Sequence, residues 1–108
     1  MSAEFYIRFE SFERYQNNQK SIASYLSSLP CFIEQNNRNE FWLLGLEDRK
    51  LPKRWEFDMR LFFKKRFILL EISGHPDSVS KDLMKFLNWL RERTSILVQD
   101  EDGEPFGW

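Results

Sequence analysis

The sequence is poor in the residues that carry the common catalytic and metal-binding chemistries. Its 108 residues include one cysteine, Cys31, one histidine, His75, and only four glycines. A single cysteine excludes a disulfide within the chain, and one cysteine with one histidine cannot supply the four ligands of a structural zinc site. The glycines form no phosphate-binding loop. We therefore expect neither a metal nor a cofactor.

Nucleophilic catalysis would require Cys31 and His75 within hydrogen-bond reach, with a third group to orient the imidazole. Asp77 is close to His75 in the sequence, but no catalytic motif surrounds either partner. A cysteine at the start of a strand is most often a small core residue, and a histidine before a proline is most often part of a turn. We expect no catalytic residues and a protein that is not an enzyme.

Long hydrophobic runs are also lacking. No apolar segment approaches the roughly 20 residues that a membrane helix needs, and the first ten residues lack the apolar centre of a signal peptide. The absence of paired cysteines fits a reducing compartment. These features predict a cytoplasmic protein that has no contact with a membrane.

Aromatic residues, in contrast, are abundant. They make up 17% of the chain, with 11 Phe and 4 Trp. This is too many for a disordered chain, and the length suits one domain over residues 1–108. Aromatic side chains that stay at the surface often mark contacts with other proteins.

The hydrophobic pattern predicts strands over residues 4–10, from 31 to 33, 41–46, 56–63, 66–73 and 96–98. In the segment 56–63, strict alternation places Asp58 with Glu56 and Arg60 on a polar side, opposite the buried face. The nearly continuous apolar run over 66–73 is typical of a central strand. Gly45, inside the predicted strand 41–46, indicates a bulge or a close approach of backbone.

Two segments have the periodicity of amphipathic helices. The first covers about 17–29 and ends at Pro30. The second covers about 78–93, and we expect Asp77 or Ser78 to cap its start. Residues 11–18 fit either a loop or an early helical turn.

The order strand, helix, four strands, helix, strand predicts an α+β fold. Its antiparallel sheet would have about five to six strands, with both helices packed on one face. The other face of the sheet would then be partly open. We expect Tyr6, Phe62 and either Trp42 or Leu43 to lie on it.

Basic residues cluster in the middle of the chain, although the net charge of -1 argues against a dedicated nucleic-acid-binding protein. Cations and aromatic side chains would bind nucleic acid if the loop 49–55 and the turn 64–66 lay close together. Ordinary solvated loops are the alternative. The candidate nucleic-acid-binding residues are Arg49, Lys50, Lys53, Arg54, Trp55, Lys64, Lys65 and Arg66.

Acidic residues cluster near the C-terminus, beside two aromatic side chains. The segment 100–104 resembles the start of a calcium loop, but it lacks the later ligands of that motif, so we interpret it as an acidic turn. Carboxylates steer a basic protein partner, and aromatic side chains anchor it. The candidate partner-binding residues are Asp100, Glu101, Asp102, Glu104, Phe106 and Trp108.

The size of the chain, the helical segment SVSKDLMKFLNWLRERT (78–94) and the segment DEDGEP (100–105) resemble those of small bacterial immunity proteins. These inhibitors neutralise polymorphic toxins or toxins of contact-dependent growth inhibition. The resemblance covers about the last third of the chain. It implies a cytosolic protein that binds a toxin domain, often a nuclease, and blocks it without catalytic residues of its own.

Overall fold

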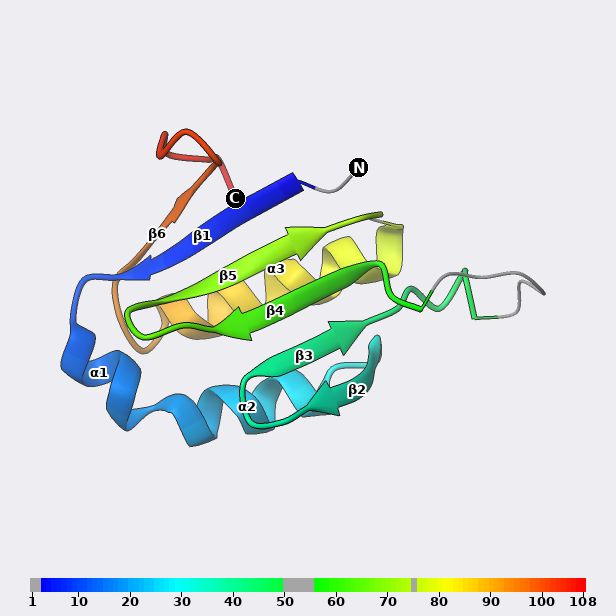
Figure 1. Cartoon of the computed structure of the whole chain (residues 1–108), viewed down its shortest axis with the longest axis horizontal. Coiled ribbons are helices and arrows are strands. Elements are labelled where there is room, and N and C mark those ends of the chain that lie inside the picture. The colour runs from blue at the N-terminus through cyan, green and yellow to red at the C-terminus, as the bar shows by residue number, and fades with distance from the viewer. Residues whose placement is uncertain (1–2, 50–55, 75) are drawn as a thin grey trace.

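The structure is a computed structural model that describes residues 3–49, 56–74 and 76–108. Six strands form one antiparallel sheet in the order β2-β3-β4-β5-β1-β6 (Figure 1). The elements are β1 (Ala3–Phe9), α1 (Phe12–Asn17), α2 (Gln19–Ser28), β2 (Phe32–Asn36), β3 (Glu40–Leu43), β4 (Met59–Phe63), β5 (Phe67–Ile72), α3 (Asp77–Arg91) and β6 (Ile96–Gln99). The predicted α+β fold is confirmed, with one additional short helix, α1.

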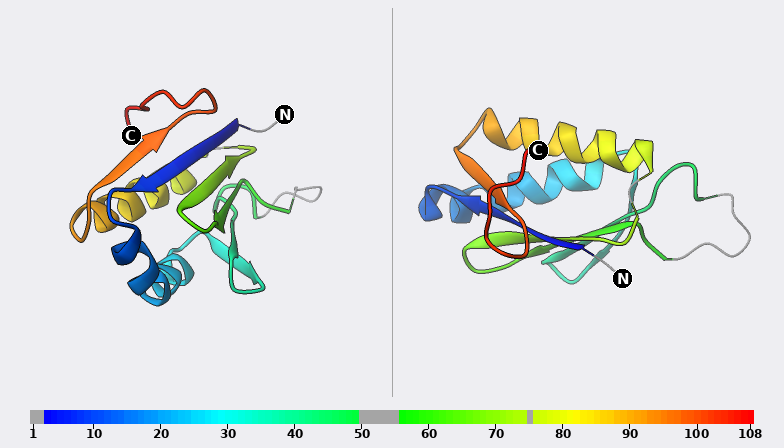
Figure 2. Two further views of the ribbon diagram at one scale, coloured as in Figure 1. Left: turned by 60° about the vertical axis from the view of Figure 1, so that its left-hand side comes forward. Right: turned by 90° about the horizontal axis from the view of Figure 1, so that it is seen from above.

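Helices α2 and α3 cover one face of the sheet, as Figure 2 shows from above. Their apolar stripes are buried against the inward-facing side chains of the strands. The buried stripe of α3 includes Val79, Leu83, Phe86, Leu87 and Leu90, and that of α2 includes Ile22 and Leu26. The helices thereby hide the apolar faces that neither could bury alone.

Strand β5 is central, as its apolar run predicts, because it pairs with β4 on one side and β1 on the other. Ile68, Leu70 and Ile72 are buried under the helices. Phe67 and Leu69 alternate with them and lie on the opposite face, which no helix covers in the described part of the chain.

The prediction for residues 56–58 is wrong. Strand β4 begins at Met59, and Asp58 is completely buried instead of facing water. The Asp58 carboxylate accepts the N–H of Gly45 at 2.7 Å, whereas the Phe57 ring packs against Trp42 with centroids 5.0 Å apart. A buried carboxylate is tolerated here because the backbone hydrogen-bonds to it.

Strand β3 ends at Leu43, three residues earlier than predicted. Beyond it, an ideal Cβ placed on Gly45 would lie 2.4 Å from Cγ of Pro76 and 3.1 Å from Asp58 Oδ2. The expected close approach at Gly45 is therefore confirmed. It brings the end of β3 against both the start of β4 and the start of α3.

Helix α3 has a different cap from the one predicted. Pro76 occupies the N-cap position and makes no side-chain cap hydrogen bond. Glu47 accepts the Ser78 N–H at 3.1 Å and also the Ser78 hydroxyl. These hydrogen bonds lower the pKa of Glu47. The helix begins at Asp77, one residue earlier than expected. The carboxylate of Glu47, in the loop after β3, supplies the hydrogen-bond acceptor at its N-terminus.

Candidate functional site

The C-terminal segment, residues 99–108, folds back along the edge strand β6. Gln99 forms an antiparallel bridge with Pro105, and the Phe106 N–H donates to the Val98 carbonyl at 2.8 Å. Between them, the Asp100 N–H donates to the Glu104 carbonyl at 2.8 Å. The acidic turn, which we define as residues 100–104, is therefore a tight, hydrogen-bonded loop.

The four carboxylates of the acidic turn differ in what they contact. Asp100 Oδ1 accepts the N–H groups of Asp102 at 2.9 Å and Glu104 at 3.0 Å, so it holds the turn together. Glu101 accepts the Glu4 N–H at 2.9 Å and ties the turn to the start of β1. Glu101, Asp102 and Glu104 are all exposed. Because Glu101 is tied to β1, Asp102 and Glu104 are the two acids best placed to meet a partner.

No carboxylate of the acidic turn forms an ion pair with a cation in the described part of the chain. The ion pairs found among the described residues join Arg60 to Glu40, Arg60 to Glu71, and Arg93 to Glu92. None of them includes a carboxylate of the acidic turn. The turn therefore concentrates four carboxylates without a direct ion-pair partner at this end of the molecule.

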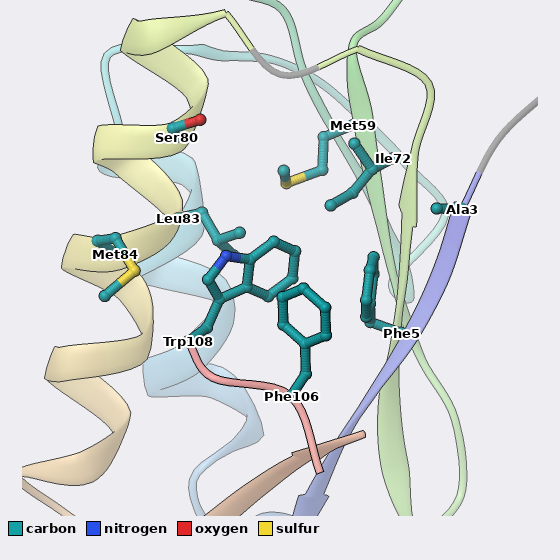
Figure 3. Close-up of a pocket in the computed structure, with 9 residues that line it drawn as sticks. All are labelled: Ala3, Phe5, Met59, Ile72, Ser80, Leu83, Met84, Phe106 and Trp108. Carbon is teal, nitrogen blue, oxygen red and sulfur yellow. The ribbon is translucent and has the colours of Figure 1, made fainter. Parts of the chain in front are cut away.

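Phe106 and Trp108 point to the helix-covered side of the sheet, where they form one wall of an apolar pocket of about 340 Å³ (Figure 3). The pocket lies between α3 and the strands β1, β4 and β5. We call it the C-terminal pocket. Its lining residues are Ala3, Phe5, Met59, Ile72, Ser80, Leu83, Met84, Phe106 and Trp108.

Three rings fix the geometry of this wall. The Phe5 centroid lies 4.8 Å from that of Phe106 and 4.7 Å from that of Trp108, and the Phe106 and Trp108 centroids are 4.7 Å apart. Arg91 donates a hydrogen bond to the Trp108 carbonyl, which holds the segment against α3. Phe106 is 40% exposed and Met84 is 37% exposed, so both form the rim.

The structure thus places all six predicted partner-binding residues in one segment, with the carboxylates in the acidic turn and the rings in the C-terminal pocket. Sequence reasoning missed the other walls of the pocket, which come from β1, β4, β5 and α3. Their residues follow ordinary core periodicity, so no local signal in the sequence distinguishes them.

The described members of the basic set lie at two ends of the sheet (Figure 1). Arg49 donates to the carbonyls of Pro30 at 2.9 Å and Phe32 at 3.4 Å, at the start of β2. The start of β2 is level with the start of β4. The turn 64–66 follows the end of β4, where it joins β4 to β5, and so lies at the other end of the sheet. Lys50, Lys53, Arg54 and Trp55 lie outside the described residues. The structure therefore does not bring Arg49 and the turn 64–66 together.

The open face of the sheet carries Tyr6, Phe62 and Trp42, as expected, while Leu43 is buried in the core. The register aligns Tyr6 with Leu69, and Leu69 with Phe62, across three neighbouring strands. These side chains form an apolar band on the open face.

Cys31 is buried, and its N–H donates to Oδ2 of Asp82 at 2.8 Å. Burial is the largest cause of the raised pKa of the Cys31 thiol. A thiol that keeps its proton is a weak nucleophile. His75, the other member of the catalytic alternative, lies outside the described residues.

Within the ranges that the structure describes, no group of three or more His, Cys, Asp or Glu residues is arranged to hold a metal ion. The same part of the chain contains no helix with the length and apolar composition required to cross a membrane. Comparisons with protein-family models, with curated proteins and with solved structures found no match to this chain.

Proposed function

We propose that this protein is a non-enzymatic binding protein that inhibits a partner protein by covering part of its surface. The observation that carries the proposal is the C-terminal pocket beside the acidic turn. One short segment supplies both a wall of this apolar cavity and a set of carboxylates that form no ion pair with the described cations. Together these features define the chemistry of the partner.

The C-terminal pocket suits an apolar side chain of the partner. Burying one Leu, Met or Phe side chain stabilises a complex by about 1.5–3 kcal/mol, and such anchors dominate binding when they enter a preformed pocket. The rings of Phe5, Phe106 and Trp108 already contact one another. Little side-chain order therefore has to be gained on binding.

The acidic turn suits a basic surface around that anchor. Asp102 and Glu104 are exposed and belong to none of the ion pairs among the described residues. Carboxylates in this position steer a basic partner toward the pocket and exclude acidic ones. We infer a partner whose contact surface has an apolar centre and a basic rim.

The most concrete form of this function is immunity to a toxin, as the resemblance of segments 78–94 and 100–105 implies. The partner would then be a toxin domain, and nucleases are fitting candidates because their substrate sites are basic. The inhibitor would act in the cytoplasm, without a membrane contact and without a cofactor.

The experiment is a growth assay in which the C-terminal domain of the adjoining upstream reading frame is expressed in cells, with and without this protein. We expect that domain to arrest growth and this protein to restore it. Phe106→Ala, which removes one rim of the C-terminal pocket, should weaken protection. Leu97→Ala is the matched control, because Leu97 is similarly exposed on β6 but lies outside the pocket. An unchanged growth arrest in the presence of the wild-type protein would refute the proposal.

A further inference from the structure

The open face of the sheet is electrostatically polarised. At the end where β4 turns into β5 it carries three exposed cations, Arg8, Lys64 and Lys65. Arg66, in the same turn, instead lies over the Phe12 ring of α1 at 4.8 Å. None of the ion pairs among the described residues includes any of them. We call this end, together with the rings of Tyr6, Phe62 and Phe67, the hairpin corner.

The opposite end of the open face is acidic and internally paired. Glu4 and Glu71 stand opposite each other in the register of β1 and β5. Arg60, the cation of this end, makes ion pairs with Glu71 and with Glu40, the latter at 3.8 Å. On the open face, the described cations of the hairpin corner therefore belong to no ion pair, whereas Arg60 is paired.

Three partly exposed aromatic rings lie among the cations of the hairpin corner. The Arg8 guanidinium is 5.1 Å from the Phe67 centroid and 5.6 Å from that of Tyr6. The Lys64 ammonium is 5.4 Å from the Phe62 centroid. The cations thus lie against the aromatic rings of this face.

We propose that the hairpin corner binds a short single-stranded polynucleotide. Its phosphates would lie against Arg8, Lys64 and Lys65, and its bases would stack on Phe67 and Tyr6. Proteins that bind single strands combine these two elements, a cationic track for the backbone and rings on which bases stack. Arginine guanidinium planes also stack on bases.

The orientation of Arg8 supports this assignment. Its Nε donates to the Gln99 side-chain oxygen at 2.5 Å, so the guanidinium is positioned by a neutral group. The charge of Arg8 therefore remains available to a phosphate. Arg60, in contrast, is neutralised by two carboxylates, although its guanidinium also lies 5.2 Å from the Phe62 centroid.

A double helix fits this surface less well. Duplex DNA is recognised by a helix or a two-stranded ribbon that enters a groove. The hairpin corner instead offers rings on the broad face of a sheet, and such rings require unstacked bases. This site is on the opposite face of the sheet from the C-terminal pocket, so it does not depend on the proposed inhibition of a protein partner.

The test is fluorescence anisotropy with labelled oligouridylate and oligothymidylate of about eight nucleotides, a length within the usual site sizes of single-strand-binding domains. Three phosphate contacts predict that affinity falls about 20-fold when salt is raised from about 50 to about 200 mM. Polyglutamate serves as an anionic chain without bases.

Phe67→Leu keeps an apolar side chain and removes the ring, and it should weaken oligonucleotide binding at least about 5-fold, the lower limit for losing one stacked base. The double variant Arg8→Gln, Lys65→Gln should lower both the affinity and its salt dependence. Its matched control is Lys20→Gln, Lys85→Gln, which removes two exposed cations from α2 and α3.

The absence of oligonucleotide binding by the wild-type protein at the lower salt concentration would overturn the proposal. Equal affinity for polyglutamate, together with unchanged binding by Phe67→Leu, would also overturn it and would assign the hairpin corner to an acidic protein segment. Circular dichroism of each variant verifies that a loss of binding is not a loss of the fold.

Discussion

The ring centroids of Phe5 and Trp108 lie 4.7 Å apart, which joins the first strand of the sheet to the C-terminal segment. Trp108 also packs against the buried core, and its carbonyl is held by Arg91. The segment that carries the proposed binding site is thus part of the folded domain. Substitutions in it can be separated into those that change stability and those that change only the surface.

Trp108→Ala should lower the free energy of unfolding by about 1–3 kcal/mol, because it removes two aromatic contacts and part of the core packing. Urea denaturation measures this. Glu104→Ala is the control, since an exposed substitution of this kind should change the free energy by no more than about 0.5 kcal/mol. Equal stability of the two variants would show that Trp108 is not part of the core.

Asp82→Ala should destabilise the protein through the backbone of β2. Asp82 is 3% exposed, and its carboxylate accepts the buried N–H of Cys31. A buried N–H left without a partner costs about 1–3 kcal/mol. The measurement is the urea midpoint, compared with that of Asp102→Ala at an exposed position. A midpoint equal to that of the control would mean that the Asp82 hydrogen bond contributes nothing.

Gly45→Ala should lower stability by about 1–3 kcal/mol, because the new methyl group would lie 2.4 Å from Cγ of Pro76 and force a shift at the start of α3. Gly107→Ala is the matched control, since nothing lies within 4 Å of a Cβ there. Thermal denaturation of both variants tests the prediction. Similar melting temperatures would contradict the close packing at Gly45.

The stability of the protein should depend on the protonation of Asp48. A hydrogen bond with the Asp58 side chain, followed by desolvation, raises the pKa of Asp48 from 3.8 to about 6. Between these two values, the folded state therefore holds a proton that the unfolded chain has released. The stability gained from binding this proton is fully present below about pH 4 and is lost as the pH rises through about 6.

Asp48→Asn removes this proton equilibrium. Its stability relative to the wild type should therefore rise between about pH 4 and pH 7. Urea denaturation of both proteins over this range measures the difference. A constant difference across the range would show that Asp48 keeps its ordinary pKa in the folded state.

Much of the fold could be predicted from the sequence because its periodicity is local. Alternation identified β1, and the continuous apolar run identified β5 as central. The sequence did not decide whether residues 11–18 form a loop or a helical turn, because a helix of six residues needs tertiary support. In α1 this support comes from the buried Tyr15 and the Ser11 cap. The burial of Asp58 could not be predicted, because it depends on the hydrogen bond from the Gly45 N–H. Gly45 and Asp58 are brought together only by the pairing of β3 with β4.

The candidate site was predictable in part for the same reason. The acids of the turn and the rings of Phe106 and Trp108 are neighbours in the sequence, so their clustering is visible without a structure. The C-terminal pocket is not, because Phe5, Ile72 and Leu83 reach it from three separate elements. The sequence also did not distinguish Asp100, which holds the turn, from Asp102, which is exposed.

The central claim is that the acidic turn is a contact surface for a basic protein partner. Calorimetric titration of the C-terminal domain of the adjoining upstream reading frame with the double variant Asp102→Lys, Glu104→Lys tests it most directly. We predict an affinity at least about 10-fold lower than that of the wild type, while Glu34→Lys, at an exposed position on the opposite edge strand, leaves the affinity unchanged. Equal affinity for the wild type and the double variant would contradict the claim.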